Sequence, residues 1–221
     1  MQYILEIVAF NLQSAILAAE SGADRIEICG NIADGGTTPS FGDLKMAREK
    51  IQISLFSMVR PRGGDFLYND EEFEAMKSDT EICKNLGYDG IVTGMLSKNG
   101  TVDKIKLKEI VKMAVPMQVT FHRAFDRTRN PLEALEDIIE CGCKRILTSG
   151  QHQFAINGIE IISELNTKAN DRIIIIPGGG ISAKNIKEIA LNTGAKEIHS
   201  PAKVILPSKM EGKFGYINEE G

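Results

Sequence analysis

The sequence predicts an α/β protein built as a single-domain (β/α)8 TIM barrel, and three observations carry that prediction. Eight short runs rich in β-branched residues alternate with segments whose apolar residues recur three and four positions apart. Four of the runs follow a glycine that suits the end of a helix. The 221 residues suit one barrel, and no linker divides them. This even alternation favours parallel strands with right-handed crossovers.

The strands are expected at eight runs rich in Ile, Val or Thr. In chain order they are Tyr3–Val8, Asp24–Cys29, Gln52–Val59, Gly90–Thr93, Gln118–His122, Arg145–Thr148, Arg172–Pro177 and Glu197–Ser200. The rival fold is an open doubly wound sheet, which would have about five or six strands and a glycine-rich turn after the first. The turn here, Ala9-Phe10-Asn11, contains no glycine. Eight units therefore favour closure into a barrel.

Helices are expected between these strands, where apolar residues form one stripe. The clearest segments are Asn11–Ser21, Asn69–Leu86, Val102–Met113, Pro131–Cys141, Ala155–Leu165 and Ala183–Asn192. Polar residues that suit an N-cap mark the helix starts at Asn11, Ser40, Asn69, Asn130 and Ser182. We assign residues 1–209 to the barrel and residues 210–221 to a polar C-terminal tail.

Composition excludes several classes of partner. The net charge is −4 and no dense Lys/Arg cluster occurs, so neither nucleic acid nor an anionic membrane is an expected partner. The longest apolar run, Ile173–Pro177, is far too short to span a membrane. The N-terminus enters strand-like sequence without the basic head and apolar stretch of a signal peptide. We therefore expect a cytoplasmic protein.

Several predicted strands place charged side chains inside the barrel. In the second strand, Ile26 and Ile28 must face the helices, so Arg25, Glu27 and Cys29 point inward. The same alternation turns Glu6, His122 and His199 inward. Buried charges are costly unless they are paired or used. For Arg25 we favour an ion pair between Glu6 and Glu27, and for groups nearer the strand exits we favour a function.

The loops after the strands carry candidate binding groups. Arg60 and Arg62 flank a glycine-containing turn, which is typical of an anion cradle, although the arginines could instead pair with nearby acids. Ser149, Gly178, Gly179 and His199 are further anion-binding candidates at strand exits. His122 is a candidate general acid or base, with Asp126 as the group that orients it.

Six phrases in the chain match a known family. They are GADRIEIC at 22–29, GGTTPS at 35–40, RPRGGDF at 60–66, GIVTG at 90–94, TFHRAFD at 120–126 and RILTSG at 145–150. On these phrases the chain resembles the CutC family, often named copper homeostasis proteins. The resemblance implies a cytoplasmic TIM barrel that forms a homo-oligomer such as a dimer, with a link to copper. Family members often carry cysteine where this chain has Val8 and Ala9, so Cys29 is the remaining candidate copper ligand near the rim.

Two functions stay open, and the sequence does not decide whether the protein is an enzyme. One is copper binding and copper homeostasis, supported by Cys29 and the resemblance. The other is an enzyme that acts on a small anionic or phosphorylated metabolite at the C-terminal barrel mouth. Its candidate catalytic residues are Glu27, His122, Glu6 and Asp126; its candidate anion-binding residues are Arg60, Arg62, Ser149, Gly178, Gly179 and His199. A third alternative, a scaffold with a purely structural polar interior, ranks last.

Overall fold

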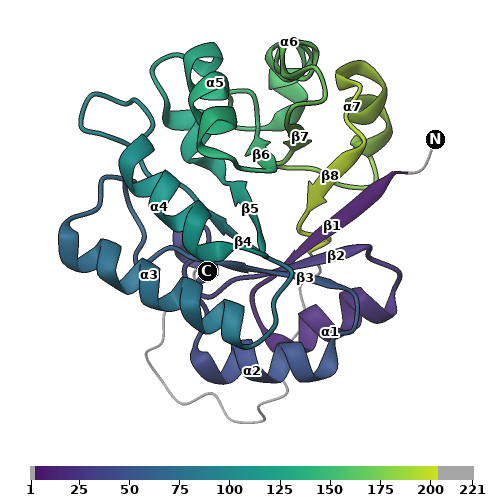
Figure 1. Ribbon diagram of the computed structural model, residues 1–221. Helices are drawn as coiled ribbons and strands as arrows, with labels where there is room; N and C mark the ends of the chain where they lie inside the picture. The colour runs from purple at the N-terminus through teal and green to yellow at the C-terminus, as the bar shows by residue number, and fades with distance from the viewer. Residues whose placement is uncertain (1–2, 204–221) are drawn as a thin grey trace, which may run out of the picture.

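A computed structural model describes residues 3–203 as eight parallel strands that form a barrel (Figure 1). The strands are β1 (Ile4–Ala9), β2 (Arg25–Ile28), β3 (Ser54–Met58), β4 (Gly90–Thr93), β5 (Gln118–Phe121), β6 (Arg145–Thr148), β7 (Ile174–Pro177) and β8 (Glu197–Ser200). The hydrogen-bonded order is β7-β6-β5-β4-β3-β2-β1-β8. β7 and β8 also contact each other, which brings the two ends of the sheet together. The predicted TIM-barrel fold is therefore confirmed.

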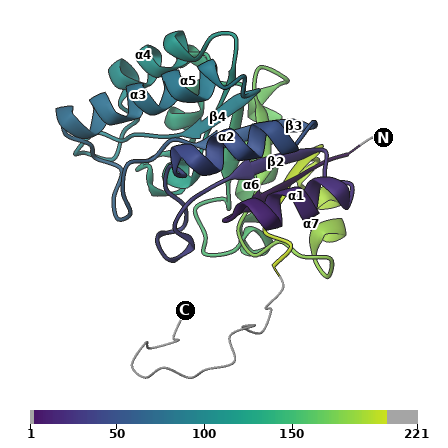
Figure 2. The ribbon, with the colours of Figure 1, turned by 90° about the horizontal axis from the view of Figure 1, so that it is seen from below.

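Seven α-helices and three short 3-10 helices lie in the described part, and the α-helices surround the strands (Figure 1 and Figure 2). The α-helices are α1 (Leu12–Glu20), α2 (Phe41–Lys50), α3 (Asp70–Asn85), α4 (Lys104–Ala114), α5 (Pro131–Cys141), α6 (Ile159–Ala169) and α7 (Ile186–Thr193). The 3-10 helices are η1 (Ile32–Asp34), η2 (Arg123–Arg127) and η3 (Ala155–Gly158). Helix α6 starts later than predicted because η3 forms the preceding turn.

The predicted N-caps are confirmed at four helices. Asn11, Ser40, Asn69 and Asn130 each accept a hydrogen bond from a backbone N–H in the first helical turn. Ser182 is not a cap, and this prediction is wrong. Its N–H donates to Asn185 Oδ1 at 2.8 Å, so the chain makes a turn before α7 begins. The predicted boundary at residue 209 lies outside the described residues.

Alternation along the strands separates two apolar regions. Ile26 and Ile28 belong to the large core between the barrel and its helices. A small cluster inside the barrel contains Cys29, Phe56, Met58 and Val92. A Cβ on Gly90 would lie only 2.4 Å from the Phe56 ring, so glycine in β4 makes room for Phe56 to fill the interior. Polar side chains occupy the rest of the barrel axis.

Candidate functional site

Four charged side chains form a paired network inside the barrel, which we call the lower network: Glu6, Arg25, Arg145 and Glu197. Arg25 donates to Glu6 and to Glu197, both at 2.5 Å. Arg145 donates to the same Glu197 oxygen at 2.8 Å. Both guanidinium groups also lie about 5 Å from the Phe56 ring centre. Every charge in this network has an opposite partner, as a buried ion-pair network requires.

The predicted position of Arg25 between two carboxylates is confirmed, but one of its partners differs from the prediction. The second carboxylate belongs to Glu197 on β8, and no described contact joins Arg25 to Glu27. Neighbouring strands of a barrel are staggered, so the long Arg25 side chain reaches a strand that is not its immediate neighbour. Glu27 is thereby left without an arginine partner.

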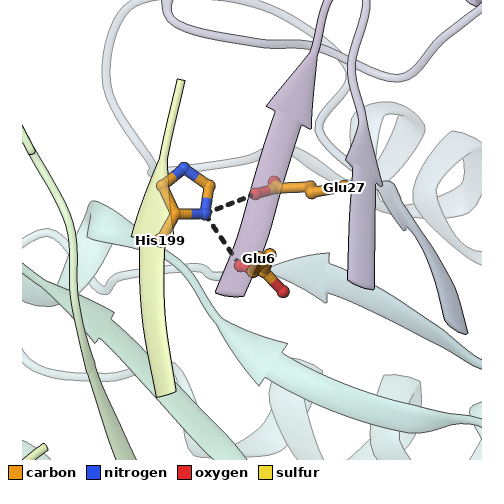
Figure 3. A group of neighbouring side chains, drawn as sticks. All are labelled: Glu6, Glu27 and His199. Atoms are coloured by element: carbon orange, nitrogen blue, oxygen red, sulfur yellow. Dashed lines mark hydrogen bonds and ion pairs between the residues drawn. The ribbon is translucent and has the colours of Figure 1, made fainter. Parts of the chain in front are cut away.

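Glu27, Glu6 and His199 form a buried cluster on the neighbouring strands β2, β1 and β8 (Figure 3). His199 Nδ1 lies 2.7 Å from Glu6 Oε1 and 3.3 Å from Glu27 Oε2. Burial alone would lower the pKa of His199, but the hydrogen bond to Glu6 and the charges of Glu27 and Glu6 raise it. The two acidic neighbours therefore favour the protonated form of His199.

The two carboxylates of this cluster differ in pKa. Burial would raise the pKa of Glu6, but His199 and Arg25 outweigh it and lower the pKa to about 2. Burial raises the pKa of Glu27 to about 7, with help from the negative charge of Glu6. Glu6 therefore stays ionised, whereas Glu27 exchanges its proton near neutral pH. That behaviour suits a general acid or base.

The same three side chains form the group of described residues that could share a metal ion, since their ligand atoms all lie within 4.8 Å of one another. In this arrangement the Nδ1 side of His199 carries the bridging proton, and the other oxygen of Glu6 is paired with Arg25. The three side chains pair with one another in this arrangement, which suits proton transfer at Glu27.

A cavity of about 230 Å³ opens at the C-terminal mouth of the barrel, directly over this cluster. We call it the mouth cavity. Six predicted residues line it together: Glu27, Cys29, Arg60, His122, Gly179 and His199. The other lining residues are Val8, Phe10, Gly35, Met58, Phe66, Arg123, Leu147, Gly180 and Pro201. Acidic, basic and imidazole groups thus meet in one partly apolar pocket, as binding sites commonly require.

His122 follows β5 and is only 3% exposed. Its Nδ1 accepts a hydrogen bond from the backbone N–H of Ala124 at 3.2 Å, while Nε2 has no partner among the described residues. Burial and the nearby positive charge of Arg60 lower the pKa of His122 to about 3. The ring is therefore neutral at physiological pH, contrary to the expectation of an imidazole that titrates near neutrality.

Arg60 leaves β3 and is 5% exposed. Its terminal nitrogens donate to the backbone carbonyls of Asp34, Gly36 and Gly64 at 2.7, 2.9 and 3.0 Å. The guanidinium carbon lies 5.0 Å from the Phe66 ring centre, and Nε has no partner in the described part of the chain. No described carboxylate pairs with Arg60, so a full positive charge is held rigidly beside the cavity.

Cys29 lies at the mouth but is protonated. Its thiol donates to Glu27 Oε1 at 3.5 Å, and burial together with the Glu27 charge raises the pKa of Cys29 well above its usual value. Cys29 and Met58 pack side by side beneath Gly36, where an added Cβ would lie within 3.5 Å of both side chains. This pair is the sulfur-rich part of the mouth cavity.

Five predicted site residues do not line the mouth cavity: Glu6, which belongs to the lower network, and Arg62, Asp126, Ser149 and Gly178. Arg62 pairs with Glu72 at 2.5 Å and Asp65 at 3.0 Å, because Glu72 faces it from the first turn of α3. Asp126 makes no described contact with His122, since η2 turns its carboxylate toward the loop after β6. It accepts there from the hydroxyl and backbone N–H of Ser149. Gly178 instead packs against Leu147 and His199.

Phe66 and Arg123 line the cavity although no site prediction included them. Phe66 stacks near both Arg60 and His122, with a ring-centre distance of 5.0 Å to His122. Its place in the RPRGGDF phrase was the available signal. An aromatic residue after an arginine-rich turn is more often read as core packing, which is why the position was missed.

Comparison with known proteins gives a consistent result. The family model described as the CutC family matches residues 3–204. A "family protein CutC" of Parabacteroides distasonis is 48% identical over 99% of this chain and 89% of that protein. The human "Copper homeostasis protein cutC homolog" is 42% identical over 95% of this chain and 77% of that protein. The crystal structure of a CutC protein from Streptococcus agalactiae has a TM-score of 0.86 at 34% identity, covering 90% of this chain and 99% of that chain.

More distant structures share the fold alone. An aldolase named QR15 superimposes with a TM-score of 0.66 at 16% identity, over 90% of this chain and 89% of that chain. Such identity supports the barrel architecture and carries no functional argument. Within residues 3–203, no helix is long and apolar enough to cross a membrane.

Proposed function

The chain belongs to the CutC family, and from this premise we propose that its mouth cavity is an enzyme active site for a small anionic metabolite. One observation carries the proposal. A carboxylate that titrates near pH 7, an arginine without a carboxylate partner and a buried imidazole N–H without an acceptor all line the same cavity. Buried groups left unpaired by the protein are costly, so they favour a ligand that completes them.

Each group has a role that its surroundings support. Glu27 exchanges a proton with the substrate, since its pKa of about 7 suits transfer in either direction. Glu6 and His199 hold Glu27 in place and are positioning residues. Arg60 supplies the fixed positive charge that an anionic group requires, and His122 supplies a neutral hydrogen-bond donor.

Copper(I) binding is the second candidate function, and the contact between Cys29 and Met58 favours it. Thiolate and thioether sulfurs are the ligands that copper(I) prefers. The mouth cavity offers one thiol, and its raised pKa means that binding must release a proton. Copper therefore has fewer suitable ligands here than an anionic metabolite has.

A competition titration with a copper(I) chelator separates this second candidate from the first. If copper(I) is bound at the mouth, Cys29→Ala weakens binding at least about tenfold, whereas Cys141→Ala, at the far end of α5, does not. Equal affinities of the native protein and Cys29→Ala would remove the copper candidate.

The active-site proposal is tested by calorimetric titration with a panel of small carboxylates and phosphate esters. We expect binding by the native protein, weakening of at least about tenfold in Arg60→Gln and in His122→Leu, and native affinity in Arg62→Gln. Arg62→Gln is the matched control because Arg62 lies outside the cavity. Circular dichroism checks that each variant is folded. Loss of binding in Arg62→Gln alone would contradict the proposed site.

A further inference from the structure

We infer that His122 is the electrophilic hydrogen-bond donor of the site, and that the substrate is a small carbonyl compound whose oxygen binds His122 Nε2 while Glu27 moves the proton on the neighbouring carbon. This inference rests on the proposed function and deepens it by naming the substrate class. It excludes the use of His122 as a general acid that starts as imidazolium. It therefore assigns the acid–base work to Glu27.

The tautomer of His122 follows from one hydrogen bond. A backbone N–H can only donate, so His122 Nδ1 must accept the bond from Ala124 with its lone pair. A neutral imidazole carries one proton, and that proton must then be on Nε2. The Nε2–H group is buried and has no acceptor among the described residues. His122 is one of the residues that line the mouth cavity, and a ligand bound there is the acceptor that we propose for this donor.

Three neighbours prevent the ring from turning to find another partner. Phe66 and Phe121 pack at ring-centre distances of 5.0 and 6.1 Å. At Gly94, an added Cβ would lie 2.6 Å from His122 Nδ1, so this glycine lets the ring sit close against the backbone of the loop after β4. The donor is therefore fixed before any ligand arrives, which is the arrangement that electrostatic stabilisation of a transition state requires.

A neutral imidazole N–H is better suited to donating a hydrogen bond to a carbonyl oxygen than to acting as a general acid. Arg60 and burial keep the ring from taking a second proton. A neutral imidazole in a low-dielectric site stabilises negative charge that develops on an oxygen, as a hydrogen-bond donor. Arg60 adds a fixed positive charge beside it, which also favours the developing oxyanion.

The proposed step balances without a cofactor. The Glu27 carboxylate removes the proton from the carbon next to the carbonyl, forming an O–H bond on Glu27. The C–H electron pair becomes the C=C bond of an enolate, and the C=O π pair moves to the oxygen that His122 Nε2–H binds. When the deprotonated carbon carries a hydroxyl group, Glu27 then returns the proton to the former carbonyl carbon, and the hydroxyl proton passes to the oxygen that His122 Nε2–H binds. The carbonyl group thereby moves to the neighbouring carbon, and the net reaction is the isomerisation of a hydroxycarbonyl compound.

Cavity size limits the substrate. A volume of 230 Å³ holds about eight groups of the size of a water molecule, taking roughly 30 Å³ for each. A substrate of about eight non-hydrogen atoms fits, which corresponds to a short hydroxycarbonyl or oxo acid.

The test compares glycolohydroxamate, a planar mimic of an enediolate, with glycolate, an anion of similar size. We expect the native protein to bind the hydroxamate at least about tenfold more tightly than glycolate in a calorimetric titration. His122→Leu should lose this preference, whereas His122→Gln, which retains an N–H donor at a similar reach, should keep part of it. Equal affinity for both probes would overturn the inference and leave anion binding, and thus the proposed function, intact.

Nitrogen NMR of the His122 ring gives a second readout that needs no ligand. We expect an unprotonated Nδ1 and a protonated Nε2 at every pH from 5 to 8, with a change of the Nε2–H signal when glycolohydroxamate binds. A proton on Nδ1, or protonation of both nitrogens in this range, would overturn the inference. His152, which is exposed, supplies the internal reference for a solvent-accessible ring.

Discussion

The barrel interior contains two layers of charged residues, and they differ in whether the protein itself pairs their charges. In the lower network, Arg25 and Arg145 meet Glu6 and Glu197 with every charge paired. In the mouth cavity above it, Arg60 has no carboxylate partner and His122 Nε2 has no acceptor among the described residues. Both layers contain arginine and glutamate on barrel strands or at their exits, so residue type alone does not distinguish structure from function.

The two layers differ in whether their charged and polar groups find partners within the protein. A paired network is satisfied by the protein itself and fixes how β1, β2, β6 and β8 meet. Unpaired donors beside a cavity are satisfied only by something that enters it. Glu6 links the two layers, since one of its oxygens binds Arg25 and the other binds His199. The lower network therefore holds the acidic cluster on which the mouth cavity depends.

Breaking the lower network should have the largest effect. Arg25→Met removes the partner of two buried carboxylates, and we expect a loss of about 3–5 kcal/mol in the free energy of unfolding, measured by urea denaturation. A loss below about 1 kcal/mol would mean that the network does not stabilise the barrel.

His122 should make the free energy of unfolding fall as the pH is lowered. Its pKa is about 3 in the folded protein and about 6.5 when unfolded, so the unfolded state binds the proton first as pH falls. The native protein thus holds its full stability above pH 6.5 and loses it progressively as pH falls toward 3. The free energy of unfolding of His122→Gln, compared with that of the native protein, should rise by on the order of 3 kcal/mol as the pH falls from 7 to 4.

The matched control for this comparison is His152→Gln at an exposed position. Its unfolding free energy should follow that of the native protein across the same pH range. Parallel curves for the native protein and His122→Gln would show that His122 is not held neutral.

Replacement by glutamine should change the free energy of unfolding in opposite directions at Glu27 and at Glu6. The folded pKa of Glu27, about 7, lies above its ordinary 4.5, so its contribution to stability is present below pH 4.5 and lost as pH rises to 7. At pH 8, Glu27→Gln should therefore be more stable than native by roughly 3 kcal/mol. Glu6→Gln should be less stable, because the pKa of Glu6 is lowered to about 2 by its partners. Urea denaturation of both variants at pH 8 measures the contrast.

Arg62→Gln should have the smallest effect, below about 1 kcal/mol in unfolding free energy. Arg62 is half-buried and pairs with Glu72 and Asp65 on the surface side of its loop. A loss of unfolding free energy close to that of Arg25→Met would mean that the Arg62 ion pairs stabilise the fold as strongly as the lower network does.

Much of the fold was readable in the sequence because alternation within a strand is a local property. Ile26 and Ile28 identified the outer face of β2, and Arg25 and Glu27 therefore had to point inward. The runs at β4, β6 and β8 were predicted with their observed bounds. The site residues Glu27, Arg60 and His122 were also expected together, because strand exits converge at one end of a barrel.

Contacts between side chains that are far apart in the sequence could not be predicted from such a local pattern. The second partner of Arg25 is Glu197, which lies 172 positions away, and strand stagger decides that contact. Asp126 is close to His122 in sequence, yet η2 turns it toward Ser149. The neutral state of His122 depends on burial and on Arg60, neither of which appears in a local pattern.

The most direct test of the contrast between the two layers is a crystal structure of the protein soaked in sulfate. We expect an anion in the mouth cavity with an oxygen within hydrogen-bond distance of His122 Nε2, and a lower network that keeps its four ion-paired side chains. A structure in which His122 Nε2 donates to a protein atom, with sulfate bound only at Arg62 or elsewhere on the surface, would contradict the account.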